Sequence, residues 1–168
     1  MRSCVCLIAA IVLLNGCSPP TALPVDKYLM GEKVHLGKLM YTVFDTQWLT
    51  HLGDAATGRV PQNRFLLIRF SAVNSGSEEA AVPALSIEDD QGRAYQEIAN
   101  GEGVPLWAGY LRTLKPAGSV QGNALFDAPP AHYKLKLSDA NSVRAALIDI
   151  PLTYGADAPE LATPPAPK

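Results

Sequence analysis

Short runs in which apolar and polar residues alternate dominate the middle of the chain. Successive side chains of a strand point to opposite faces, so residues 64–73 (RFLLIRFSAV) place every second side chain on one apolar face. Residues 132–138 (HYKLKLS) alternate more cleanly, with Lys134 and Lys136 on the polar face. The side chains that this pattern predicts to be buried are Leu66, Ile68, Phe70, Phe126, Tyr133, Leu135 and Leu137.

Three further runs are predicted to be strands. Residues 119–126 (SVQGNALF) also bring apolar side chains to one face. Residues 143–150 (VRAALIDI) are apolar on both faces, which is typical of a strand inside a sheet. In residues 37–48, the pattern places Leu39, Tyr41 and Val43 on one face and Met40, Phe44 and Trp48 on the other.

Turn signals separate the predicted strands. Asp90-Gln91-Gly92 stands between residues 83–89 and residues 93–98, and therefore predicts a hairpin. No long stretch shows the period of about 3.6 residues that marks an amphipathic helix. The chain is therefore predicted to be all-β, with about seven short strands forming a single immunoglobulin-like antiparallel β-sandwich.

The amino-terminal stretch MRSCVCLIAAIVLLNGC has the features of an export signal. Arg2 precedes an apolar run that is about half as long as the roughly 20 residues of a membrane-spanning helix. Leu14-Asn15-Gly16-Cys17 resembles the bacterial lipobox, in which a small residue stands directly before the cysteine, although Asn15 departs from the usual small or hydroxyl residue. The pattern predicts lipidation of the Cys17 thiol. The alternative is an ordinary secretory signal with a chance cysteine.

Changes in composition divide the chain into four segments. Residues 1–16 are expected to form a lipoprotein signal peptide that is cleaved off. Residues 17–32 are expected to form the lipidated N-terminus and a flexible tether, because they carry prolines and lack periodicity. Residues 33–154 are long enough for one sandwich with its own core. Residues 155–168 carry four prolines and are expected to form a disordered tail.

The use of cysteine and the net charge narrow the possible chemistry. Cys4 and Cys6 fall in the predicted signal and Cys17 takes the lipid, so the folded domain is expected to have neither a disulfide nor a thiolate ligand. Without Arg2, 13 of the 14 basic side chains remain against 16 acidic ones, a net charge of −3. This weak charge argues against a nucleic-acid partner, which would require a clustered basic face.

Glu88-Asp89-Asp90 offers a possible cation site, but the pattern argues against it. Consecutive strand residues point to opposite faces, so the three carboxylates cannot converge on one calcium ion. A turn in which Gly92 adopts a positive φ and the aspartates accept backbone hydrogen bonds explains the same residues. The three histidines are far apart, and no H-E-x-x-H or G-x-S-x-G motif occurs. We therefore expect no catalytic residue, no metal and no cofactor, and we expect the protein not to be an enzyme.

Two long loops are candidates for a functional surface. Residues 49–63 form a polar link, and residues 99–113 (ANGEGVPLWAGYLRT) are too irregular for a predicted strand. The second loop brings Trp107, Tyr110 and Arg112 together, and these residue types dominate binding hot spots. We therefore consider these three as a partner-binding surface. The favoured alternative is that Trp107 and Leu111 plug an open end of the sandwich, and Trp48 is likewise expected in the core.

Several turn and strand motifs resemble a family of bacterial envelope proteins. The matching motifs are Val73-Asn74-Ser75, Asp89-Asp90-Gln91-Gly92-Arg93-Ala94-Tyr95, Leu114-Lys115-Pro116-Ala117-Gly118, and Gly122 with Leu125-Phe126-Asp127-Ala128-Pro129. The family carries an immunoglobulin-like domain known as domain of unknown function 4352. Its members are often lipid-anchored, and its fold is similar to that of a secreted mycobacterial antigen. The resemblance spans roughly Lys33 to Leu152 and implies a fold but no activity.

These observations predict a periplasmic lipoprotein whose sandwich binds or scaffolds another envelope component, either a protein or a wall component. Ser18 after the lipidated cysteine, in place of aspartate, favours the outer membrane by resemblance to Gram-negative lipoproteins. A carrier of a small ligand or metal is the first alternative, and a hydrolase of wall or lipid substrates is the second.

Overall fold

Two packed sheets and a short two-stranded sheet make up the computed structural model, which describes residues 25–54, 57–138 and 144–153. The strands are β1 (Val25–Tyr28), β2 (Val34–Leu36), β3 (Leu39–Leu49), β4 (Phe65–Asn74), β5 (Ala80–Val82), β6 (Ser86–Asp89), β7 (Ala94–Gln96), β8 (Arg112–Leu114), β9 (Ser119–Asp127), β10 (Tyr133–Ser138) and β11 (Ala145–Ile150). Within these described ranges, no helix is both long and apolar enough to cross a membrane.

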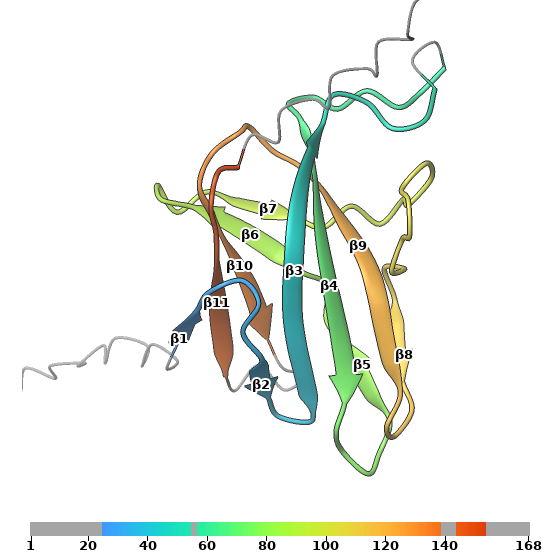
Figure 1. Cartoon of the computed structure of the whole chain (residues 1–168), viewed down its shortest axis with the longest axis vertical. Helices are drawn as coiled ribbons and strands as arrows, with labels where there is room; N and C mark the ends of the chain where they lie inside the picture. The colour runs from blue at the N-terminus through green and yellow to red at the C-terminus, as the bar shows by residue number, and fades with distance from the viewer. Residues whose placement is uncertain (1–24, 55–56, 139–143, 154–168) are drawn as a thin grey trace, which may run out of the picture.

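The strand order confirms the predicted all-β sandwich. One sheet has the order β1-β11-β10-β6-β7, the other has the order β2-β3-β4-β9, and β5 pairs with β8 (Figure 1). All pairs are antiparallel except that of β1 with β11. The hairpin predicted around Gly92 is the β6–β7 pair, and Gly92 has φ +79°, the left-handed conformation that glycine tolerates best.

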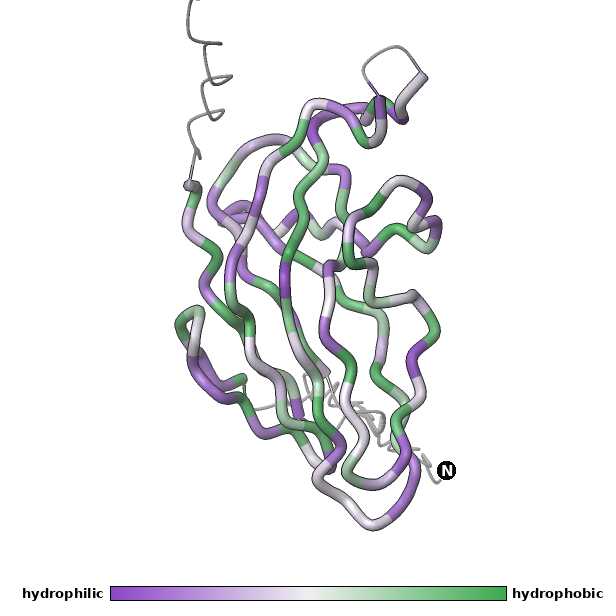
Figure 2. The backbone as a smooth tube through the Cα atoms, turned by 45° about the vertical axis from the view of Figure 1, so that its right-hand side comes forward, coloured by the Kyte–Doolittle hydropathy of each residue, from purple (hydrophilic) through white to green (hydrophobic). Residues whose placement is uncertain are grey.

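The core between the two main sheets contains the residues that the alternating pattern selects. Leu66, Ile68, Phe70, Phe126, Tyr133, Leu135 and Leu137 are each at most 1% exposed. Apolar and polar positions alternate along the backbone of the strands, as Figure 2 shows. Lys136 is exposed as predicted, whereas Lys134 is only half-exposed, because its ammonium group pairs with the Asp90 carboxylate at 2.8 Å.

The start of the folded domain lies earlier than the sequence analysis placed it. Val25–Tyr28, which we assigned to the tether of residues 17–32, form the edge strand β1, and Val25 pairs in parallel with Ala145 of β11. Strand β11 therefore lies between two other strands, and its two apolar faces predicted such an interior position. Pairing with β1 satisfies backbone hydrogen-bonding groups of β11 that would otherwise be unpaired at the edge of the sheet.

A β-bulge corrects the predicted faces of β3. The pairing of β3 with β4 shifts between Val43 and Asp45, and the extra residue, Phe44, is 44% exposed. The shift reverses the alternation after Val43. Trp48 therefore faces the core, on the same side of the sheet as Tyr41, and not the opposite side that the pattern predicted. Its ring centroid is 6.2 Å from that of Tyr133, which confirms the expectation that Trp48 belongs to the core.

A second, smaller apolar cluster covers the outer face of the four-stranded sheet. Phe65 and Leu67 of β4 and Leu125 of β9 are buried there, together with Leu52 and Val104 from the two long loops. The two loops singled out by the sequence therefore meet over one face of β4 and β9. Their packing positions the candidate functional site at the edge of this sheet.

Candidate functional site

Backbone hydrogen bonds fasten residues 105–111, the edge loop, to the outer edge of β9. The amide of Asn123 donates to the Leu106 carbonyl at 2.8 Å, and the amide of Ala108 donates to the Asn123 carbonyl at 3.1 Å. The Asn123 side-chain amide also donates to the Pro105 carbonyl at 2.7 Å. The edge loop thus occupies hydrogen-bonding groups that an edge strand would otherwise expose.

Two glycines allow the edge loop to approach this closely. A Cβ atom at Gly122 would lie 2.3 Å from the Leu106 carbonyl oxygen, so a larger residue there would force the loop off β9. A Cβ atom at Gly101 would lie 1.9 Å from Cδ2 and 2.2 Å from Cε2 of Trp107. One face of the indole ring therefore rests on the backbone of Gly101. Both contacts hold the edge loop in one conformation.

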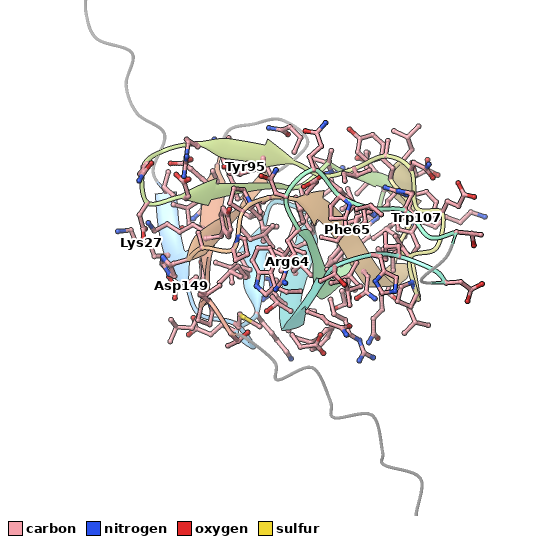
Figure 3. The ribbon with its side chains drawn as sticks, turned by 90° about the horizontal axis from the view of Figure 1, so that it is seen from above. Lys27, Arg64, Phe65, Tyr95, Trp107 and Asp149 are labelled. Carbon is pink, nitrogen blue, oxygen red and sulfur yellow. The ribbon has the colours of Figure 1, made fainter. Side chains whose placement is uncertain are left out.

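The edge loop exposes large apolar side chains in spite of this fixed backbone. Leu106 is 71% exposed, Trp107 is 39% exposed and Leu111 is 92% exposed, while Tyr110 is half-buried. Leu106 has φ +48°, a left-handed conformation that costs a residue with a Cβ roughly 1–2 kcal/mol. Leu111 therefore does not plug the sandwich, contrary to the favoured interpretation, and Trp107 is only partly buried. Figure 3 shows Trp107 at one side of the molecule.

Arg112 does not belong to the exposed surface, which corrects the predicted set of Trp107, Tyr110 and Arg112. Its side chain is 2% exposed and forms a bidentate ion pair with Glu97, whose side chain is 0% exposed. Arg112 begins β8, so its side chain points inward like that of Leu114 two residues later. Its guanidinium carbon lies 5.0 Å from the centre of the Phe70 ring. Arg112 is therefore a structural residue.

The two long loops also meet in a shallow pocket of about 270 Å³. The Arg59 guanidinium lies at this pocket and donates to the carbonyls of Asn100 at 2.9 Å and Glu102 at 3.2 Å. It also lies 5.3 Å from the centre of the Phe65 ring. Arg59 thus ties the loop of residues 49–63 to the loop that carries Trp107.

The acidic turn has the structural role that the sequence predicted. The buried Asp89 carboxylate accepts hydrogen bonds from the amides of Gln91 and Arg93 and from Arg93 Nε at 2.6 Å. Burial raises the pKa of Asp89, but the hydrogen bonds from Arg93 and Gln91 outweigh it, so the pKa lies below its ordinary value. Within the ranges that the structure describes, no group of three histidine, cysteine, aspartate or glutamate side chains is arranged to hold a metal ion.

His132 joins the acidic turn to β11. Its Nδ1 lies 3.1 Å from an Asp90 oxygen and its Nε2 lies 2.8 Å from an Asp149 oxygen. Partial burial lowers the pKa of His132, but the hydrogen bonds to Asp149 and Asp90 outweigh it and raise the pKa above 6.5. The Lys134 hydrogen bond, followed by that of His132, lowers the pKa of Asp90. The cluster is an ion-pair network between β10, β11 and the turn after β6.

The predicted lipidation site, Cys17, lies outside the described residues, as do the predicted signal peptide and the tail of residues 155–168. Of the predicted surface residues, Trp107 is exposed and Tyr110 half-buried. The sequence analysis missed Leu106 as a surface residue and assigned Leu111 to a plug. Both leucines stand beside aromatic residues in a glycine-rich segment. The sequence analysis did not use this pattern as a sign that the leucines are exposed.

Solved structures similar to this chain share its sandwich. A β-sandwich protein of Clostridium difficile 630 has a TM-score of 0.52 at 9% identity, covering 80% of this chain and 99% of that one. The ycdA protein of Bacillus subtilis, described as a candidate lipoprotein, has a TM-score of 0.54 at 13% identity, covering 73% of this chain and 39% of that one. MPT63, a secreted protein of Mycobacterium tuberculosis, has a TM-score of 0.53 at 12% identity, covering 76% of this chain and 98% of that one.

These identities are low enough that the structural likenesses support the fold alone. No curated protein sequence matches this chain. The sequence does match one domain family, and the matched region runs from the last residue of β1 to the first residue of β11. Together with the observed sandwich, this match assigns the chain, over residues 28–145, to the family described as Domain of unknown function (DUF4352).

Proposed function

We propose that this protein is a lipid-anchored, non-catalytic envelope protein whose edge loop binds another component of the cell envelope. The observation that carries the proposal is the edge loop itself. Its backbone is fixed by Asn123, by the close approach to Gly122 and by the contact of Trp107 with Gly101. A fixed backbone lowers the entropy that a binding surface loses when a partner docks.

The exposed side chains of the edge loop support binding rather than packing. Leu106 and Leu111 contribute little buried apolar surface that would stabilise this domain, and Leu106 keeps an unfavourable backbone conformation. Strain and exposed apolar groups that persist in a fixed loop are more typical of an interaction surface than of a core element. Trp107 and Tyr110 add the residue types that are enriched at binding hot spots.

The anchor rests on the amino-terminal sequence. Leu14-Asn15-Gly16-Cys17 follows the lipobox pattern, and two or more acyl chains on one cysteine are enough for stable membrane attachment. The description of ycdA as a candidate lipoprotein and of MPT63 as a secreted protein is consistent with an envelope location for this fold. Ser18 favours the outer membrane, with the domain in the periplasm.

The proposal is tested by a photo-crosslinking amino acid placed in the full chain and activated in intact cells. Leu111 is the test position, because its side chain is 92% exposed in the edge loop. Val60 is the matched control, because it is an apolar residue that is 78% exposed in the other long loop. We expect a discrete adduct from position 111 and none of the same mass from position 60. Identical weak adducts from both positions would exclude the edge loop as a specific binding surface.

A further inference from the structure

The edge loop and the start of the folded domain lie at opposite sides of the sandwich. β1 is one edge strand of the five-stranded sheet, and β7 is the other. The edge loop is fastened to β9, which contacts β7, whereas β2, at the other edge of the second sheet, contacts β11 beside β1. Figures 1 and 3 agree on this separation, and Figure 3 shows Lys27 of β1 and Trp107 at opposite ends of the view.

The chain between the predicted lipid and the domain is short. β1 begins at Val25, eight residues after Cys17, so the connection spans at most about 29 Å when fully extended. Five strands at about 4.8 Å spacing make the sheet from β1 to β7 about 19 Å wide, and the edge loop is fastened to β9, which contacts β7. Turning the edge loop toward the bilayer would therefore require the connection to span about two thirds of its fully extended length, which costs conformational entropy.

The charge of the edge loop also argues against a lipid surface. Residues 99–111 contain no lysine or arginine, and Arg112 is buried in its ion pair with Glu97. The single charged side chain of this stretch is Glu102, which would be repelled by anionic headgroups. The attraction that usually supports membrane contact by a surface loop is therefore missing.

The exposed groups indicate an apolar protein segment as the partner. Leu106 and Leu111 expose hydrocarbon only, which offers no hydrogen bonds to the hydroxyl groups of a glycan. One face of the Trp107 ring is covered by Gly101, and the side chain remains 39% exposed, so part of the ring is available for contact with a partner. Apolar side chains, and proline rings in particular, pack well on such an aromatic surface.

From these observations we infer that the edge loop faces away from the anchoring bilayer and binds an apolar segment of a second envelope protein. This inference rests on the proposed function, because it requires both the anchor and the binding role. It adds the orientation of the domain and the chemical class of the partner.

The orientation is tested with the lipidated full chain in vesicles of phosphatidylethanolamine and phosphatidylglycerol that carry dansyl headgroups. The chain has two tryptophans, so Trp48→Phe leaves Trp107 as the single energy donor. A second variant, with Trp48→Phe, Trp107→Phe and Leu29→Trp, places the donor next to β1 at a residue that is 64% exposed. We expect several-fold more energy transfer from position 29 than from Trp107. Equal or stronger transfer from Trp107 would overturn the orientation.

The class of partner is tested on the adduct formed at position 111 in intact cells. We expect this adduct to be removed by protease, to resist muramidase and phospholipase, and to disappear with Trp107→Ala. An adduct that muramidase or phospholipase removes would overturn the inference and leave the proposed function standing. An adduct that contains only a second copy of this chain would overturn both, because the proposed partner is a different envelope component. The absence of any adduct at position 111 would overturn both.

Discussion

Arg112 and Glu97 form a bidentate ion pair inside the sandwich, with side chains that are 2% and 0% exposed. Glu97 Oε2 also accepts a hydrogen bond from the Leu85 amide at 3.0 Å, so the pair links the segments before β6, after β7 and at β8. Arg112 is one residue away from the almost fully exposed Leu111. The ion pair therefore anchors the carboxyl end of the edge loop in the core.

Breaking this pair is expected to destabilise the protein strongly. Arg112→Ala leaves the Glu97 carboxylate buried without its cation, which typically costs about 3–5 kcal/mol. The double variant with Arg112→Met and Glu97→Leu replaces both charges by apolar groups and is expected to be much closer to the wild type. Urea denaturation of a soluble chain that starts at Ser18 measures both free energies of unfolding. A double variant as unstable as the single one would show that the charges themselves are required.

The faces of β10 provide a second prediction. Leu135 is 0% exposed between the sheets, so Leu135→Ala is expected to lower the free energy of unfolding by about 2–5 kcal/mol. Lys136→Ala is the control, because its side chain lies on the exposed face and its removal is expected to change stability by less than about 0.5 kcal/mol. Similar losses for the two variants would be incompatible with the described register of β10.

The His132 network predicts a pH dependence of stability. Its folded pKa is raised above the ordinary value of 6.5. The stabilisation from protonated His132 is therefore fully present below about pH 6.5 and is lost as the pH rises through the folded pKa. We expect the difference in melting temperature between the wild type and His132→Gln to shrink between about pH 6 and about pH 9.

The control for this experiment is the histidine of β2. His35→Gln is expected to show no such trend, because His35 is exposed and forms none of the described ion pairs. The side chains of Asp90, Asp149 and Lys134 face His132. Melting temperatures of Asp149→Asn over the same pH range therefore separate the stabilisation that His132 gains from β11 from the stabilisation that it gains from the turn. A difference that grows with pH would contradict the described network.

The lipid anchor predicts that Cys17 is the acylated residue. Cys17→Ser is expected to abolish labelling by a fatty-acid probe and to move the protein from the membrane to the soluble fraction. Cys6→Ser is the matched control, because Cys6 lies within the apolar run of the predicted signal. Undiminished labelling of Cys17→Ser would show that the lipobox assignment is wrong.

The alternation of apolar residues was sufficient to predict the long strands and much of the core, because this pattern is visible in local sequence. The cores of β4 and β10 were predicted residue by residue for this reason. The alternation did not predict the short strands β1 and β8, which lie in segments that we assigned to a tether and to an irregular loop. The bulge at Phe44 was not predicted, because an inserted residue reverses the alternation without any local marker in this sequence. Arg112 was misassigned because its partner, Glu97, is 15 residues away, and only the folded chain brings the two together.

The role of the edge loop also depended on contacts that a single sequence does not show. Trp107 was identified as a candidate from its residue type and its irregular surroundings. Whether Trp107 plugs the sandwich or lies at the surface depends on two contacts. Gly101 lies against the indole ring, and the backbone of the edge loop approaches Gly122 of β9 closely. These contacts join separate parts of the chain, so residue type alone left both interpretations open.

The most direct test of the central claim compares stability and binding in Trp107→Ala. Because Trp107 is 39% exposed, its loss is expected to cost clearly less than the roughly 3–5 kcal/mol of a fully buried aromatic residue, and the melting temperature should change little. The crosslinked adduct formed in intact cells at position 111 should disappear in the same variant. A strongly lowered melting temperature with the adduct preserved in the folded protein would contradict the account, because Trp107 would then be a plug and not a contact.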